Sequence, residues 1–244
     1  MKQRPFEIIY ENDDYIVINK KAGILSIPDR YHDDKINVFT LLKQYRDPIF
    51  SVHRLDKETS GTMVYAKNEE AHKYLSDQFE SRKVVKKYLA IVQGSPVNDS
   101  DEIITKVAAS LTQKNKMVVV NKGKEAITKY KVLERFKNYA LLEVSILTGR
   151  QHQIRVHMSY IGHPLAVDSK YGNKSNLYAY EIKQGKFNYS KEREPRPLIS
   201  RHSLHAEKLE FIDKASGELR EFISPLPKDM KAVLNQLRKW SPLV

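Results

Sequence analysis

The order of strand and helix patterns constrains the fold of this 244-residue chain more than any other feature. Runs rich in β-branched and aromatic residues predict strands, and segments with apolar residues at helical spacing are inserted between them. The two kinds do not alternate regularly, as they do in folds built from strand–helix–strand units. The sequence therefore predicts the α+β class, with a mixed, mostly antiparallel sheet and flanking helices.

The individual elements follow from local patterns. Strands are predicted at 7–20 (two short strands around an Asn-Asp-Asp turn), 50–55, 61–68, 84–94, 116–121, 126–136 and 139–147. Helices are predicted at 36–46, 69–83 and 227–240, and a further helix opens at Thr148, where Gln151 completes a capping box, and ends at Gly162 and Pro164. Residues 56–60 thus lie in a loop between two strands, where catalytic groups are often placed.

Residues 173–201 differ from the rest, since they are polar, mixed in charge and contain four aromatic side chains. We interpret them as a loop insertion or an appended hairpin within one catalytic domain spanning 1–244. The chain has no Cys, no segment typical of a signal peptide, and no stretch near the ~20 apolar residues of a membrane span. We expect a soluble, cytoplasmic protein without membrane contact, and nothing in the sequence demands more than a monomer.

Charge points to a polyanionic partner. The net charge is +12, from 42 Lys and Arg against 30 Asp and Glu, and 14 Tyr accompany it. Positive charge attracts nucleic acid, and aromatic faces stack on unpaired bases. Neither GxGxxG nor GxxxxGK[ST] occurs, so nucleotide hydrolysis and redox cofactors find no support, and we expect no cofactor.

The segment HRLDKETSG at 53–61 places Arg54 two residues before Asp56. On an extended stretch both side chains point to one face, and a guanidinium beside a carboxylate lowers the pKa of the acid. Two interpretations remain open: a structural ion pair at a strand end, or a reactive carboxylate kept ionised by basic neighbours.

The expected helix start at Thr148 is a second candidate. Its first-turn N–H groups and positive dipole end favour an anion, and Arg150 and Arg155 add charge. The anion would be an RNA phosphate or the Asp56 carboxylate, and the alternative is a solvated basic face.

The histidines give no pattern for a metal. His152 and His157 are five residues apart on the expected helix and do not share a face, and no acidic or Cys ligand pattern surrounds His202 and His205. We expect no metal, and hydrogen bonds from these rings to backbone or RNA. Tyr88, taken alone, is a core residue of a strand.

Several segments together resemble the RluA-type family of RNA pseudouridine synthases. HRLDKETSG matches that family's HRLD[KR]xTSG, and KKYLAIVQG at 86–94 is similar to its KxYxAxVxG. TGRQHQIRVH at 148–157, the GHP and D-x-x-Y-G that follow it, and LHAEKLEF at 204–211 are similar to later segments. VINKKAGILSIP at 17–28 resembles the opening segment, except that Lys21 replaces the usual Pro. The resemblance covers most of 8–225.

The resemblance implies a pseudouridine synthase catalytic fold with a role for each matched residue. Asp56 is the implied catalytic carboxylate, and Arg155 pairs with it. Tyr88 packs on the flipped base, and a part for it in removing the C5 proton stays open. Arg54 fills the space that the flipped uridine leaves in the RNA, and Leu209 lines the pocket. Further candidate substrate contacts are His53, Thr59, Arg150 and Gln153.

The implied reaction isomerises uridine in ribosomal RNA, transfer RNA or both, without cofactor or metal. Asp56 would act as nucleophile or as base at the sugar. The insertion at 173–201, and the absence of the small N-terminal RNA-binding domain that many members carry, leave the RNA undetermined. Two alternatives remain: a catalytically silent RNA-binding protein of the same fold, and a carboxylate enzyme such as a glycosidase. The latter usually needs two opposed acids, and no second acid stands out.

Overall fold

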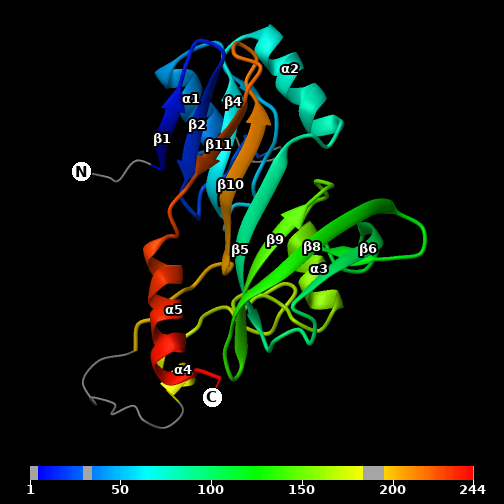
Figure 1. The fold of residues 1–244 in the computed structure, drawn as a ribbon, viewed down its shortest axis with the longest axis vertical. Helices are drawn as coiled ribbons and strands as arrows, with labels where there is room; N and C mark the ends of the chain where they lie inside the picture. The colour runs from blue at the N-terminus through cyan, green and yellow to red at the C-terminus, as the bar shows by residue number, and fades with distance from the viewer. Residues whose placement is uncertain (1–4, 30–34, 184–194, 244) are drawn as a thin grey trace. The chain divides into compact units, whose positions relative to one another are not determined.

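A computed structural model describes residues 5–29, 35–183 and 195–243, which form two compact units (Figure 1). The first unit comprises Met1–Tyr88 and His205–Pro225, and the second comprises Leu89–Leu204 and Leu226–Val244. The boundaries fall inside two strands, β5 (Val85–Gln93) and β10 (Leu204–Ile212). No shift of composition marks this division, which is why the sequence analysis predicts a single domain over 1–244.

Strands of the first unit follow the order β1-β2-β4-β10-β5. Their bounds are Phe6–Glu11 for β1, Tyr15–Lys20 for β2 and Ser60–Ala66 for β4. β3 (Phe50–Ser51) pairs with β4, and β11 (Leu219–Ile223) pairs with β10. The β1–β2, β2–β4, β3–β4 and β10–β11 pairings are antiparallel and that of β4 with β10 is parallel, so the predicted strands around residues 7–20 and 61–68 are confirmed.

The parallel contact of β4 and β10 depends on a glycine. Ser60 and Gly61 pair with His205 and Ala206. Gly61 has φ +124, and a Cβ added there would overlap the Ala206 carbonyl oxygen and lie 2.6 Å from its carbonyl carbon. The glycine that ends HRLDKETSG is thus required by the close approach of two backbones.

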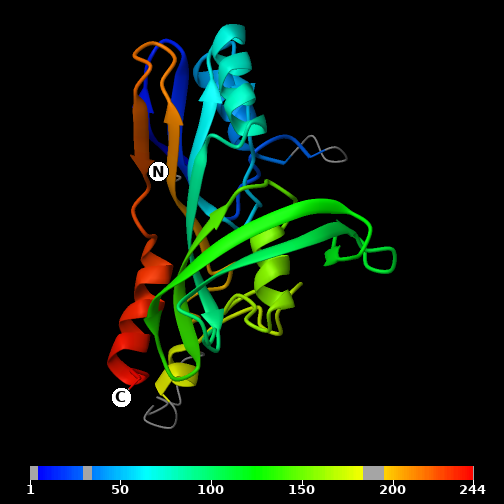
Figure 2. The same cartoon turned by 45° about the vertical axis from the view of Figure 1, so that its right-hand side comes forward.

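Two helices of the first unit lie within the ranges predicted for them, 36–46 and 69–83. The side chain of Asn37 accepts a hydrogen bond from the N–H of Thr40 at the start of α1 (Val38–Tyr45). Asn68 caps α2 (Glu69–Glu80) in the same way. Figure 2 shows both helices on one side of the strands. The apolar side of α2 packs into a core built from strands β2, β4 and β10.

In the second unit the strand order is β5-β9-β8-β6-β7. The bounds are Ser100–Ala109 for β6, Met117–Val119 for β7, Lys124–Arg135 for β8 and Tyr139–Ile146 for β9, and the helices are α3 (Gln153–Tyr160), α4 (Ala179–Lys183) and α5 (Lys228–Trp240). The α+β class with a mostly antiparallel sheet is confirmed.

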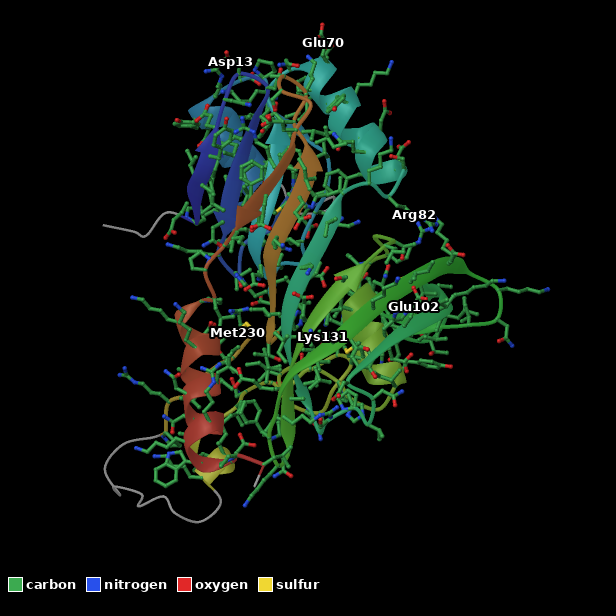
Figure 3. All side chains as sticks on the ribbon, viewed as in Figure 1. Asp13, Glu70, Arg82, Glu102, Lys131 and Met230 are labelled. Atoms are coloured by element: carbon green, nitrogen blue, oxygen red, sulfur yellow. The ribbon has the colours of Figure 1, made fainter. Side chains whose placement is uncertain are left out.

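Helices α3 and α5 lie on opposite sides of the second unit's strands (Figure 2). Leu89 and Ile91 point from β5 into the core that α5 completes, and Met230 enters that core from α5 (Figure 3). On the other side Val156 of α3 packs against Val107. Alternate residues of the strands therefore serve two different cores.

Four expectations need correction. The predicted strand 50–55 ends at Ser51, and β6 was not predicted at all, because six of its ten residues are exposed and its apolar residues do not alternate with polar ones. The capping box at Thr148 is wrong: α3 begins at Gln153, after His152 with φ 56, and has no side-chain cap. The insertion 173–201 is more than a loop, because Leu177, Ile182 and Ile199 join the α5 core. Its residues 184–194, with Phe187 and Tyr189, lie outside the described residues.

Within the described ranges, every helix is too short or too polar to cross a membrane.

We expect Gly61→Ala to lower the free energy of unfolding by at least about 3 kcal/mol, because the added methyl overlaps backbone that cannot rotate away. Gly149→Ala is the matched control, since a Cβ there meets nothing within 4 Å. Urea denaturation of both variants measures the difference. Equal stability of the two would show that the β4–β10 contact relaxes freely.

Candidate active site

Asp56 lies in an irregular loop of residues 52–59 between β3 and β4, called the Asp56 loop below. The side chain is partly exposed, and the backbone carbonyl accepts a hydrogen bond from the N–H of Thr59 at 3.0 Å. Arg54 is exposed. Because the strand has already ended at Ser51, the expectation that Arg54 and Asp56 share a face of an extended strand does not carry over.

The buried side chain of Lys20 fixes the backbone of this loop through hydrogen bonds. Lys20, at the end of β2, is fully buried, and its ammonium donates to the carbonyls of Lys21 (3.0 Å), Ile24 (2.8 Å) and Lys57 (3.1 Å). The N–H of Gly23 donates to the same Lys57 carbonyl at 2.9 Å. The segment after β2 is thus bonded to the residue directly after Asp56.

Ser26 adds a second link. Its hydroxyl donates to the carbonyl of Leu55 at 2.8 Å and accepts from the Leu55 N–H at 3.1 Å. The carbonyl of Ser26 accepts from the hydroxyl of Tyr65 at 2.9 Å, which ties it to β4. Bonds on both sides of Asp56 therefore fix the loop backbone without any regular structure. Sequence reasoning missed Lys20 and Ser26, although both lie in the matched segment 17–28.

Tyr88 is buried on β5 in the same unit. Burial raises the pKa of its phenol above the ordinary value, and the negative charge of Asp56 raises it further. The structure therefore brings Asp56 and Tyr88 within electrostatic reach, and the phenol stays protonated near neutral pH.

Three other first-unit candidates have different surroundings. His53 accepts a hydrogen bond from the N–H of Val64 at 3.1 Å and stacks on Phe79. The buried hydroxyl oxygen of Thr59 has no hydrogen-bond partner within the described part of the chain. Leu209 packs into the core beneath α2. Thr59 therefore has a buried polar group that is available for a ligand.

In the second unit, Arg155 is clamped by the D-x-x-Y-G segment. Its Nε and Nη2 donate to Asp168 at 2.7 and 3.0 Å, and its guanidinium lies 4.8 Å from the ring centre of Tyr171. Burial alone would raise the pKa of Asp168, but the Arg155 guanidinium outweighs burial and lowers it. The sequence assigns no role to Asp168 of the D-x-x-Y-G segment. In the structure its carboxylate orients the buried guanidinium of Arg155.

The buried side chains of Gln153 and Thr148 form a hydrogen-bonded cluster. The Gln153 amide accepts from Thr148 and from the N–H of Arg150, and it donates to Ile127 and Thr128. Both ends of the amide are therefore used inside the unit, so Gln153 anchors the turn before α3 and is not free to contact a substrate.

Arg150 lies at the edge of a groove of about 520 Å³. Its Nε donates to the carbonyl of Glu125 at 2.8 Å, and the groove is bordered by β6, β7 and the start of β8. Lys124 lines the same groove. Arg150 thus adds positive charge at a concave surface, which fits contact with a phosphate better than a role in the core.

The histidines bond to protein groups. His157 lies between the hydroxyls of Thr105 (2.9 Å) and Thr128 (2.8 Å), and His205 between Ser60 and the carbonyl of Ser224. Burial lowers the pKa of His157 to about 4. Burial and, secondarily, the charge of Lys86 lower that of His53 to about 3. In the described ranges no three His, Asp or Glu side chains gather as metal ligands do.

Comparisons with known proteins agree with the motifs. Residues 14–160 match the family described as RNA pseudouridylate synthase. The chain is 37% identical over 244 residues to "Uncharacterized RNA pseudouridine synthase YlyB" of Bacillus subtilis, covering 96% of this chain and 73% of that one. It is 38% identical over 240 residues to "Ribosomal large subunit pseudouridine synthase D" of Pseudomonas aeruginosa, covering 96% and 72%.

A solved structure shares the fold. Human RNA pseudouridylate synthase domain containing 4 is similar with a TM-score of 0.71 and 28% identity, over 95% of this chain and 92% of that chain. Fold and sequence thus define a class of enzyme, the isomerases that act on uridine in RNA. The chain belongs to the RNA pseudouridylate synthase family, and the resemblance predicted from its motifs is confirmed.

We expect Lys20→Met to lower the stability of the protein by a few kcal/mol, because three carbonyls lose a charged donor at once. Lys57→Met is the control, since that side chain is exposed with only a 3.9 Å contact to Glu58, and the carbonyl that Lys20 binds is kept. Urea denaturation gives the midpoints. A Lys20→Met midpoint equal to that of Lys57→Met would mean that the loop does not depend on this ammonium.

The rings of His53 and His157 are expected to remain neutral from pH 8 down to about pH 5, since their folded pKa values lie below the ordinary value of about 6.5. In this interval the unfolded chain binds more protons, so the free energy of unfolding falls as pH falls from about 6.5 toward 3 to 4. NMR titration of the ring signals, assigned with His53→Gln and His157→Gln, measures this. A midpoint near 6.5 for either ring would contradict it.

Proposed function

We propose that this protein isomerises specific uridines to pseudouridine in large-subunit ribosomal RNA, with Asp56 as the catalytic carboxylate. One observation carries the proposal: Asp56 stands on a loop fixed on both sides by Lys20 and Ser26, within electrostatic reach of the buried Tyr88 phenol. A reactive group held this way needs little reorganisation at the moment of reaction.

The chemistry asks for one carboxylate. The N1–C1′ bond of uridine breaks, the base turns, and C5 bonds to C1′; C5 loses a proton and N1 gains one. No group enters or leaves the RNA. Asp56 acts as nucleophile or as base at the sugar. On the family resemblance, Arg155 is proposed to pair with Asp56, and Asp168 orients the Arg155 guanidinium within the second unit.

Access to the uridine requires that it leave the stack. Flipping costs a few kcal/mol, which phosphate contacts and an inserted side chain offset. Arg54 is proposed as the inserted side chain, since it is exposed two residues from Asp56. Thr59, whose hydroxyl is unused among the described residues, is proposed as a polar contact to the base or sugar.

Tyr88 is proposed to pack against the flipped base. Because its phenol stays protonated near neutral pH, a phenolate acting as base at C5 is not supported. The phenol is also a hydrogen-bond donor beside Asp56, which suits a developing negative charge.

Ribosomal RNA is preferred over transfer RNA because of the relatives. The Pseudomonas aeruginosa and Buchnera aphidicola proteins, at 38% and 36% identity, are both named ribosomal large subunit pseudouridine synthase D. Activity on transfer RNA remains an outcome of the test below.

We expect Asp56→Asn to reduce turnover at least about 10³-fold while RNA affinity changes by no more than a few fold, because the carboxylate reacts but contributes little to binding. Tritium release from RNA labelled at uridine C5 measures turnover, with large-subunit ribosomal fragments and transfer RNAs as substrates. Fluorescence anisotropy measures affinity.

Glu58→Gln is the matched control, because it removes a carboxylate from the same loop at a position with only a weak 3.9 Å contact to Lys57. It should keep its activity. Release by Asp56→Asn would refute the role of Asp56. Binding without release by the wild type, on every RNA tested, would favour the catalytically silent RNA-binding alternative.

A further inference from the structure

Five basic side chains are buried among the described residues, and four of them have an evident partner. Lys20 donates to three carbonyls, Lys67 pairs with Glu11, Arg155 with Asp168, and Arg201 with Asp229. The fifth is Lys86. Within the described part of the chain it has no carboxylate or carbonyl in hydrogen-bond reach.

Lys86 sits on β5, two residues before Tyr88, and is only 9% exposed. Side chains two apart on a strand share a face, so Lys86 and Tyr88 point to the same side of β5. The ammonium lies 5.7 Å from the ring centre of Phe79, the ring that His53 also stacks on. Lys86 is therefore a neighbour of the Asp56 loop.

The surroundings of Lys86 are electropositive. Burial and then the charge of Arg82 lower its pKa, and Lys86 in turn lowers the pKa of His53. Arg82 lies two residues after the end of α2 (Figure 3) and has φ 60, a conformation that favours Gly. A buried cation beside a second cation costs free energy in the free protein, and such a cost is removed by an anion.

We propose that Lys86 binds a backbone phosphate of the RNA strand that carries the target uridine, next to the base packed on Tyr88. The ammonium keeps contact with solvent, so a phosphate can reach it. The inference rests on the proposed function, since it names a contact of that substrate.

The structural alternative is that the stem of Lys86 merely covers the Phe79 ring. Lys86→Met separates the two explanations, because Met keeps the stem and removes the charge. Lys86→Arg restores the charge. Lys83→Met is the matched control, since Lys83 is exposed and precedes β5 by two residues.

The experiment measures Kd for a large-subunit ribosomal RNA fragment at several salt concentrations. For Lys86→Met we expect roughly 10-fold weaker binding at 0.1 M salt and a log–log salt slope smaller by about 0.7 to 1, the loss of one phosphate contact. Lys86→Arg should restore most of the slope, and Lys83→Met should leave it within about 0.3 of wild type. Should Lys86→Met fail to fold, Lys86→Gln takes its place.

A wild-type slope in Lys86→Met would overturn the inference, and so would an equal change in Lys83→Met, which would indicate only general charge attraction. Tritium release by the wild type is measured on the same fragment. Its absence would count against the proposed function alone, because the salt slope tests Lys86 without any turnover.

Discussion

The Asp56 loop depends on the hydrogen bonds that the ammonium of Lys20 donates. A charge removed from water is tolerated only when hydrogen bonds replace its hydration, and here three carbonyls do so. Two of them belong to the turn after β2, and the third follows Asp56 directly. Neither segment can shift alone without leaving a buried cation unsatisfied. These hydrogen bonds fix the backbone of a loop that has no regular structure, which suits the catalytic role proposed for Asp56.

Elements with strong local signals could be predicted from the sequence. Asn37 and Asn68 begin α1 and α2 because their side chains accept from backbone N–H groups three residues on. β6 could not be predicted, because it lies next to the edge strand β7 and six of its ten residues are exposed. Its sequence therefore shows little alternation of apolar and polar residues. The cap at Thr148 failed for a related reason: the hydroxyl that would cap the helix instead bonds to the N–H of Ile127 and to Gln153. The Thr148 hydroxyl therefore bonds to a backbone group 21 residues away and not to the first turn of the helix.

The candidate site divides in the same way. Asp56, Tyr88 and Arg155 could be named as candidates only through the family resemblance, because the local pattern leaves Asp56 open between an ion pair and a reactive carboxylate and makes Tyr88 a core residue. Their supports could not, because Lys20 reaches Lys57 across 37 positions and Ser60 reaches His205 across 145. Nor does a sequence reveal that both ends of the Gln153 amide form hydrogen bonds within the protein. Motifs point to candidate groups, whereas long-range hydrogen bonds determine which neighbouring side chains remain available to bind a substrate.

The distribution of charge separates binding from chemistry. Buried arginines and lysines largely meet carboxylates or carbonyls, and the buried His157 is kept neutral. Most of the excess of +12 therefore resides on side chains in contact with solvent. Surface charge attracts RNA over a Debye length of about 10 Å, and this attraction weakens with salt, whereas buried ion pairs such as Arg155 with Asp168 are screened much less. Salt should thus loosen the RNA long before it alters the buried ion pairs, and the buried Lys86, proposed to bind a phosphate, belongs to both regimes at once.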